Sequence, residues 1–169
     1  MMSEHQVILG YLDQLDRLQP QLLTEDTGES GSILEAVGTL GEHLLSAENH
    51  HQREEQILFP AIEEIGVVGP TQAMTQEHKW LRPAKRAIID LATDKSTANG
   101  GGSFEELATK ISYLTSMLRS HIAREDQVLY PMAYHIIPDS KEWDALKLAC
   151  DTIGYCPFTP SQRGNTAVI

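Results

Sequence analysis

The chain has 169 residues, of which 41% are hydrophobic and 22% are charged, and its formal net charge is −11. This length allows one domain with a full hydrophobic core, and the composition is ordinary for a soluble globular protein. The negative charge argues against nucleic acid or an anionic membrane as a partner, because both attract basic patches. No apolar run could span a bilayer and the first residues do not form a signal peptide, so we expect a cytoplasmic protein.

Four long helical patterns and a short fifth one follow one another along the chain, so we predict an all-α fold. Three of the long patterns open near Ser3, Ser32 and Ser103, each followed by Gln or Glu three residues later, which is the spacing of a capping box. The glycine-rich stretch 96–102 is expected to be a linker, and the residues after Gly154 an irregular tail. The expected helices cover residues 3–23, 32–65, 70–94, 103–134 and 139–152.

A duplicated segment lies in the second and fourth patterns. The stretch from His50 to Pro60 recurs 71 residues later, and its positions 1, 4, 5, 7, 9 and 11 are identical in the two copies. Each copy places a histidine four residues before a glutamate, as His50 and Glu54, then His121 and Glu125. On a helix this spacing puts imidazole and carboxylate on one face, one turn apart.

Both pairs belong to stripes of apolar residues and are therefore predicted to point into the core. An unpaired ionisable group in a core costs on the order of several kcal/mol, whereas a whole domain is stable by only roughly 5–15 kcal/mol. A metal ion compensates, because it binds neutral imidazole and ionised carboxylate. The two stripes are Phe104, Leu107, Ile111, Leu114, Leu118, His121, Glu125, Val128 and Met132, and, 71 residues earlier, Ile33, Ala36, Leu40, His43, Ala47, His50, Glu54, Ile57 and Ala61.

The first and third helices are expected to complete a metal cage, since ligands in a helical bundle come from facing helices. Each offers a histidine that directly follows a glutamate. Four imidazoles and two carboxylates suit two iron ions, with manganese or zinc less favoured. Each carboxylate can bridge both ions, and an oxo or hydroxo bridge from solvent would leave an open position on each. The predicted metal ligands are His5, His50, Glu54, His78, His121 and Glu125.

Some neighbouring residues compete for these roles. His51 and Glu55 have the same spacing as the first pair, but the aromatic-Pro dipeptide that ends each copy favours His50 and Glu54. His51 and Glu55 are then expected around the ligands or on the surface. His43 is expected to be a hydrogen-bonded core or partly exposed residue, with a place beside the site as the alternative. The prolines at the end of each copy are expected to kink their helices or to mark where unwinding begins.

With these motifs the chain resembles the hemerythrin-like, or HHE cation-binding, family from about Ser3 to Tyr134. The resemblance rests on the two His-x-x-x-Glu pairs with their aromatic-Pro dipeptides, on His5 and on Glu77-His78. It implies an up-down-up-down four-helix bundle over residues 1–136, with a short helix and tail over 137–169 packed on it. It also implies a non-haem di-iron centre that meets dioxygen, nitric oxide or peroxide, or that senses iron.

The chain departs from the classical oxygen-carrying hemerythrins at two places. Those proteins have two histidines four apart on the third helix, whereas this chain has Met74 before His78. Their fourth helix uses a His-x-x-x-x-Asp pair, so Asp126 competes with Glu125 as the bridging carboxylate. We favour Glu125, because it matches Glu54 in the repeat. The missing imidazole favours turnover or sensing over reversible oxygen carriage.

The predicted function is a non-haem di-iron protein that binds or reacts with a small oxidant, in sensing or in oxidative or nitrosative stress. A peroxide-decomposing enzyme at the same centre is the alternative, and an oxygen carrier or iron store is less favoured. A ferritin-like oxidase needs paired Glu-x-x-His motifs, but only Glu48 and His51 have that spacing. A metal-free helical interaction module is the remaining possibility. Cys150 and Cys156 are expected to be reduced, with a local disulfide or redox pair left open.

Overall fold

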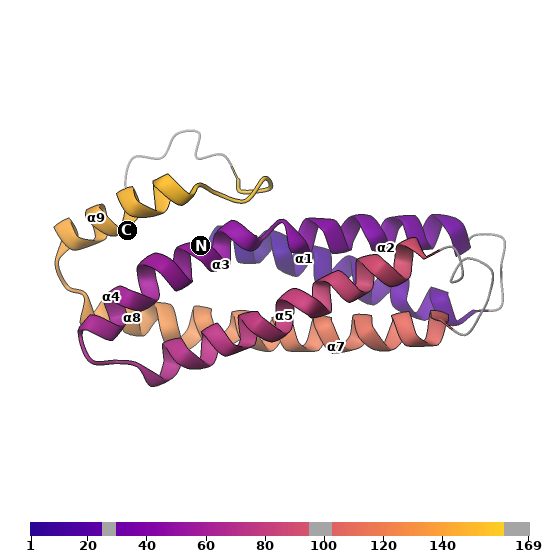
Figure 1. Cartoon of the computed structure of the whole chain (residues 1–169), viewed down its shortest axis with the longest axis horizontal. Coiled ribbons are helices and arrows are strands. Elements are labelled where there is room, and N and C mark those ends of the chain that lie inside the picture. The colour runs from indigo at the N-terminus through magenta and orange to yellow at the C-terminus, as the bar shows by residue number, and fades with distance from the viewer. Residues whose placement is uncertain (25–29, 95–102, 161–169) are drawn as a thin grey trace.

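The computed structural model describes residues 1–24, 30–94 and 103–160, and these form helices and no strand, which confirms the all-α prediction (Figure 1). The expected linker at 96–102 and the end of the tail lie outside these residues. The helices, in chain order, are α1 (Met2–Leu18), η1 (Gln19–Leu23), α2 (Ser30–Leu45), α3 (Glu48–Arg53), η2 (Glu54–Leu58), α4 (Phe59–Glu64), α5 (Gly69–Thr93), α7 (Ser103–Arg124), η3 (Glu125–Leu129), α8 (Tyr130–Ile136) and α9 (Ser140–Ile153).

Some expected helix ends differ from those observed. The residue before α1 is Met1, so Ser3 lies inside the helix and its predicted capping box is wrong. Helix α2 begins at Ser30, which likewise puts Ser32 inside the first turn. The cap expected at Ser103 involves a side chain outside the described part of the chain. Helix α9 does have a side-chain cap, because Asp139 accepts a hydrogen bond from the backbone N–H of Lys141 at 2.9 Å.

Each copy of the repeat contains one π-helical segment, η2 or η3, which begins at its glutamate. The N–H of Phe59 donates to the carbonyl of Glu54, and the N–H of Tyr130 donates to the carbonyl of Glu125, five residues back in each case. A π-turn is wider than an α-turn, and such turns often occur at functional sites. The prolines follow in the first turn of α4 and α8, where a missing N–H costs least.

The π-turns change which residues face the core beyond the glutamates. In the second copy His121, Glu125, Leu129 and Ala133, each four residues apart, are buried together with Ile122, whereas Val128 is 56% exposed. The predicted stripe is therefore wrong at Val128, because it assumed an ordinary α-helix through this region. The first copy behaves in the same way, with Leu58 buried and Ile57 only partly so. His43 is exposed as well, and Leu44 takes the core position beside it.

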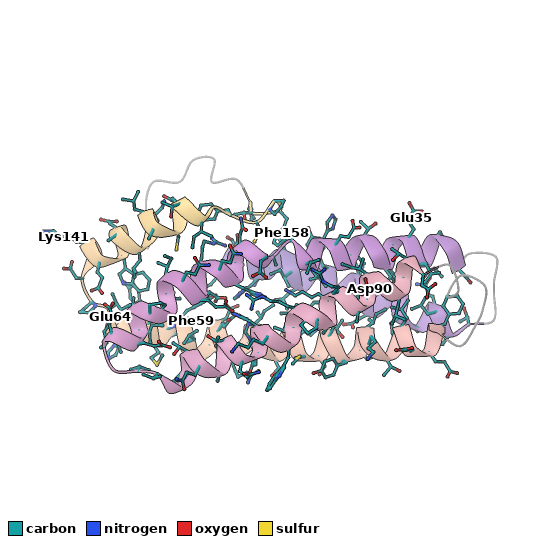
Figure 2. The ribbon with its side chains drawn as sticks, in the orientation of Figure 1. Glu35, Phe59, Glu64, Asp90, Lys141 and Phe158 are labelled. Atoms are coloured by element: carbon teal, nitrogen blue, oxygen red, sulfur yellow. The ribbon has the colours of Figure 1, made fainter. Side chains whose placement is uncertain are left out.

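The long helices lie side by side along the molecule (Figure 1). Helix α1 packs on both α2 and α7, and α5 packs on the same two helices. Acidic and basic residues such as Glu35 and Lys141 point outward, whereas Phe59 lies between helices (Figure 2). The buried apolar residues form two clusters, one containing Leu118 and the other Leu129. Along α7 and η3, His121 and Glu125 fall between these two clusters, so a polar layer interrupts the core.

Helix α9 lies along the outside of the bundle and contacts α3 and η2 (Figure 1). The indole N–H of Trp143 donates to the carbonyl of Ile137 at 2.8 Å, which fixes α9 to the end of α8. Among the described residues, no helix combines the length and apolarity that crossing a membrane requires.

Gly41 on α2 lies where α2 and α5 approach each other closely, and Gly10 on α1 is an uncrowded helical glycine for comparison. A Cβ added at Gly41 would lie 2.8 Å from Cγ1 of Ile89, whereas one added at Gly10 would meet nothing within 4 Å. Gly10→Ala should raise the free energy of unfolding by about 0.5–1 kcal/mol through helix propensity. Gly41→Ala should lower it by about 1–3 kcal/mol through overpacking. Denaturant titrations at equal metal loading check this, and a stabilising Gly41→Ala would contradict the packing described.

Candidate metal centre

Four buried imidazoles, one from each of α1, α3, α5 and α7, face one another in two pairs. The Nε2 atoms of His5 and His50 lie 2.9 Å apart, and those of His78 and His121 lie 3.0 Å apart. All four side chains are at most 2% exposed. The bundle thus brings together histidines that are up to 116 residues apart in the sequence.

Two buried carboxylates lie between the histidine pairs. Oε2 of Glu54 is 3.5 Å from Nε2 of both His50 and His78. Glu125 places Oε1 3.0 Å from Nε2 of His121 and Oε2 3.3 Å from Nε2 of His5. Each carboxylate therefore reaches both histidine pairs, which is the arrangement needed to bridge two cations.

An outer ring of carboxylates orients the imidazoles. When Nδ1 of a neutral ring donates its proton outward, its Nε2 lone pair is left to face the centre. All four of these hydrogen bonds are 2.8 Å long. They join His5 to Asp126, His50 to Glu4, His78 to Glu55 and His121 to Glu77.

The donor atoms fit metal ions, and burying these atoms without a cation would cost free energy. Oε2 of Glu54 and both carboxylate oxygens of Glu125 are buried without a hydrogen-bond partner among the described residues. Two Nε2 lone pairs at about 3 Å would also repel each other. A cation between each pair would remove both penalties at once, because it would bind the lone pairs and the unpartnered oxygens together.

The electrostatics of the cage favour positive charge. Burial lowers the pKa of His50, but the Glu54 carboxylate and the hydrogen bond to Glu4 outweigh it and raise this pKa to about 9. Burial raises the pKa of Glu125, but the surrounding imidazoles, His121 first, hold it well below its ordinary value. A metal ion would bind here by displacing protons from the imidazoles.

The centre has an internal two-fold pattern that extends beyond the repeat recognised in the sequence. An offset of 73 relates Glu4-His5 on α1 to Glu77-His78 on α5. The offset of 71 relates Arg53, which donates to Glu4 at 2.5 Å, to Arg124, which donates to Glu77 at 2.7 Å. Sequence reasoning missed this ring of acidic and basic residues. The repeated Glu-His dipeptide and the arginine at position 4 of the repeat were the available signals.

The two halves of the centre differ at the aromatic residue of each copy. The hydroxyl of Tyr130 donates to Oε1 of Glu54 at 2.5 Å, whereas Phe59, in the equivalent position, has no hydroxyl to offer Glu125. The ring of Tyr130 also stacks on His5 with 5.6 Å between ring centroids. Burial and the charge of Glu54 raise the pKa of Tyr130 well above its ordinary value, so the phenol stays protonated.

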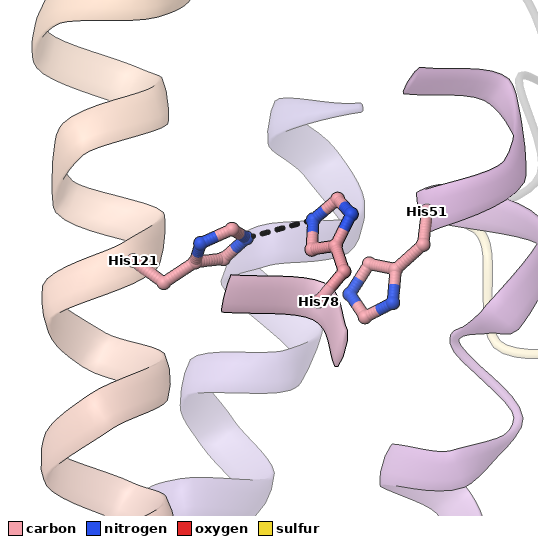
Figure 3. A group of neighbouring side chains, drawn as sticks. All are labelled: His51, His78 and His121. Atoms are coloured by element: carbon pink, nitrogen blue, oxygen red, sulfur yellow. Dashed lines mark hydrogen bonds between the residues drawn. The ribbon is translucent and has the colours of Figure 1, made fainter. Parts of the chain in front are cut away.

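His51 is a fifth buried histidine at the centre, so the expected position around the ligands fits and the alternative surface position does not. It is 3% exposed, and its ring lies 3.9 Å from the His78 ring at an interplanar angle of 14° (Figure 3). Lone pairs of imidazole lie in the ring plane, so two nearly parallel rings cannot direct them at one ion. In this position His51 holds the ring of His78 rather than joining it as a ligand.

Lys85 is a second buried polar residue whose counterpart in the internal two-fold pattern is apolar. It is 2% exposed, and burial lowers its pKa to about 8. The Lys85 charge acts with burial to lower the pKa of His51 well below its ordinary value. The offset of 73 pairs Lys85 with Leu12 on α1, and the offset of 71 pairs His51 with Ile122 on α7. Both polar replacements therefore fall on the side of the centre that holds His78.

The segment after α9 reaches the outer ring on the opposite side. Thr159 donates its hydroxyl to Oε1 of Glu4 at 2.5 Å, and the backbone N–H of Cys156 donates to the same oxygen at 3.3 Å. Glu77, the counterpart of Glu4, receives no bond from residues 154–160, the described part of this segment. Cys150 and Cys156 are both free and buried, so the two do not form a disulfide.

The six predicted ligands thus lie together in one buried layer, while their binding of metal stays a prediction. Asp126 and Glu55, the competing carboxylates, bind imidazoles from outside and do not enter the layer. The geometry therefore favours Glu125 and Glu54 as the carboxylates of the centre.

The bridging role of Glu125 can be tested by removing its charge. Glu125→Gln should lower bound iron well below the about two ions per chain that a paired centre holds, because an amide is a poor metal ligand. Glu105→Gln, an exposed change on the same helix, should leave the iron content intact. Elemental analysis after loading decides, and full iron content in Glu125→Gln would exclude Glu125 as a ligand.

The bond from Thr159 to Glu4 should hold metal in the His5 and His50 half more firmly. Thr159→Val should therefore weaken metal retention by roughly 10-fold or more in that half, since outer partners orient ligands. Stopped-flow release of metal to a chelator should show one of two phases accelerated. Thr152→Val removes a hydroxyl bonded only within α9 and should change neither phase. Equal acceleration of both phases would contradict an effect confined to one half.

Comparison with known proteins agrees with this arrangement. A family model described as the hemerythrin HHE cation binding domain matches residues 1–133. The iron-sulfur cluster repair protein YtfE of Edwardsiella ictaluri (strain 93-146) is 31% identical over 118 residues, which are 67% of this chain and 52% of that protein. The chain spans about half the length of this curated relative. Helix α9 lies beyond the residues that the family model matches. The chain belongs to the hemerythrin HHE cation binding domain family.

Proposed function

We propose that this protein carries a non-haem di-iron centre that binds or reacts with a small oxidant, such as dioxygen, nitric oxide or peroxide, in sensing or in the response to oxidative or nitrosative stress. The observation that carries the proposal is the convergence of four Nε2 atoms on carboxylate oxygens that have no other partner. The proposal includes an up-down-up-down bundle over residues 1–136, with residues 137–169 packed on it.

Iron is the metal that the donor set favours. Four imidazoles and two carboxylates form a borderline set that suits iron, with manganese and zinc less favoured. The relative's name associates that protein with iron-sulfur cluster repair, which supports a role in iron chemistry under stress. When bound, two bridged irons would supply electrons and open positions for a small oxidant.

The chain's own residues support chemistry with such a ligand in three ways. The apolar clusters on either side of the polar layer exclude bulk water from it. The outer carboxylates hold each imidazole in one tautomer. The hydroxyl of Tyr130 holds a proton beside Glu54 at neutral pH.

The alternative is an enzyme that decomposes peroxide at the same centre. Reducing one peroxide to water consumes two protons and two electrons, and oxidising a second peroxide to dioxygen returns both, so a group that holds a proton at the centre favours this reaction. Tyr130 places a hydroxyl proton beside Glu54, and Phe59 has no hydroxyl to place in the other half. A reversible oxygen carrier gains nothing from a donor that promotes reduction, so carriage is the less favoured function.

Elemental analysis and an optical spectrum test the proposed centre. We expect about two irons per chain and, in the oxidised protein, near-ultraviolet charge-transfer bands typical of a bridged ferric pair. Anaerobic mixing with peroxide then separates the two functions. Many turnovers per iron indicate an enzyme, and one stoichiometric oxidation indicates a binding protein. A protein that loads no iron under these conditions would refute both.

Tyr130→Phe replaces the tyrosine beside Glu54 with phenylalanine, the residue that the other copy of the repeat has as Phe59. If Tyr130 delivers a proton, this variant should keep its iron and lose roughly 10²-fold or more of any peroxide turnover. Tyr113→Phe changes an exposed phenol on α7 and should keep full turnover. Unchanged turnover in iron-loaded Tyr130→Phe would remove the proton-donor role.

A further inference from the structure

A cavity of about 590 Å³ lies between α9 and the bundle, on the outer side of the His5 and His50 half of the centre. Its walls are mainly apolar and aromatic. They come from α9, from α8, from the start of α1 and from η2, and they include Met2, Ile57, Tyr134, Trp143 and Leu146. The volume falls in the range of pockets that hold small organic molecules, roughly 300–1,000 Å³.

Three further wall residues connect this cavity to the candidate metal centre. Asp126 binds Nδ1 of His5 at 2.8 Å, and Tyr130 donates to Glu54 at 2.5 Å. Arg53 donates to Glu4, which in turn binds His50. A molecule in the cavity would therefore lie one side chain away from His5 and Glu54. Occupancy can change the hydrogen bonds that these two proposed ligands make.

The charged side chains in the cavity wall are already paired, which favours an uncharged ligand. Arg53 is bonded to Glu4, and Asp126 to His5. Lys147, at the α9 side, pairs with Asp151 at 2.9 Å. A charged molecule would lose hydration on entering and would meet no unpaired charged side chain among the described wall residues.

The aromatic walls favour a flat ligand. The rings of Tyr134 and Trp143 lie 6.3 Å apart at 34°, and the ring of Tyr130 separates the cavity from His5. Aromatic pairs contribute attraction beyond their buried area. Helix α9, which supplies Trp143 and Leu146, lies outside residues 1–133, so this extension encloses the cavity against the domain that the family model matches.

We propose that this cavity, enclosed by α9, is a binding site for a compact uncharged aromatic molecule, and that Tyr130 and Asp126 transmit its occupancy to the metal centre. The transmission rests on the proposed di-iron function. The binding site itself is built from residues outside the six proposed ligands and stands without it.

Indole is a suitable probe, because it is uncharged, flat and compact, and indole-3-acetate is a charged analogue. Calorimetry on the iron-loaded protein should show saturable binding of about one indole per chain. Indole-3-acetate should bind roughly fivefold or more weakly, since its carboxylate loses hydration and meets no unpaired basic side chain in the described wall. Absence of saturable indole binding, or tighter binding of the acetate, would overturn the proposal.

Two matched substitutions on α9 locate the site. Leu146→Trp fills the cavity from its α9 wall and should weaken indole binding by roughly tenfold or more. Leu148→Trp places the same side chain two residues away, at a position that is 69% exposed and outside the cavity, and should leave binding unchanged. Circular dichroism checks that both variants keep their helices. Equal affinity in the two variants would place indole elsewhere and overturn the proposal.

The optical spectrum tests the transmission. Saturating indole should shift the charge-transfer bands of the iron-loaded protein, and Tyr130→Phe should reduce that shift when both proteins are compared at saturation with indole. Binding without any band shift would overturn the link to the centre. A protein that binds indole but shows no iron pair would refute the proposed function and leave the binding site supported, so the two failures are distinguishable.

Discussion

The cost of burying six ionisable side chains in one layer determines much of this structure. Glu54 and Glu125 are fully buried, and three of their four oxygens lack a hydrogen bond among the described residues. Four imidazoles turn lone pairs toward the same space. An arrangement of this kind is stable only with positive charge inside it, because burial without compensation would cost a large share of a domain's stability. The ring of outer carboxylates and the π-turns both serve to hold the layer in place.

Two similar helix pairs, α1 with α3 and α5 with α7, build the layer. The differences between the pairs make the two halves of the layer unlike each other. Symmetric residues hold the cage, including the arginines that bind Glu4 and Glu77. The asymmetric residues act on the surroundings of each half. Tyr130 places a protonated phenol on one side, and His51 stacks on His78 on the other. An internal repeat therefore supplies the proposed ligands, and its departures from symmetry give the two halves of the layer different surroundings.

The chain beyond the matched domain adds to the same half that carries Tyr130. Thr159 reaches Glu4, and α9 encloses the cavity whose walls include Tyr130 and Asp126. This extension thus contacts the outer ring without contributing one of the six proposed ligands.

The spacing of histidines and glutamates in the sequence was enough to predict much of the centre. A histidine four residues before a glutamate shares a helix face wherever that helix packs, and a constant offset of 71 marked both pairs as equivalent. Tertiary structure decided the rest. The π-turns moved Val128 out of the core, because a wider turn changes every later position on the helix. The burial of His51 and Lys85 and the partners of each Nδ1 also depend on which helices meet, and pairings between distant helices leave no periodic signal in a sequence.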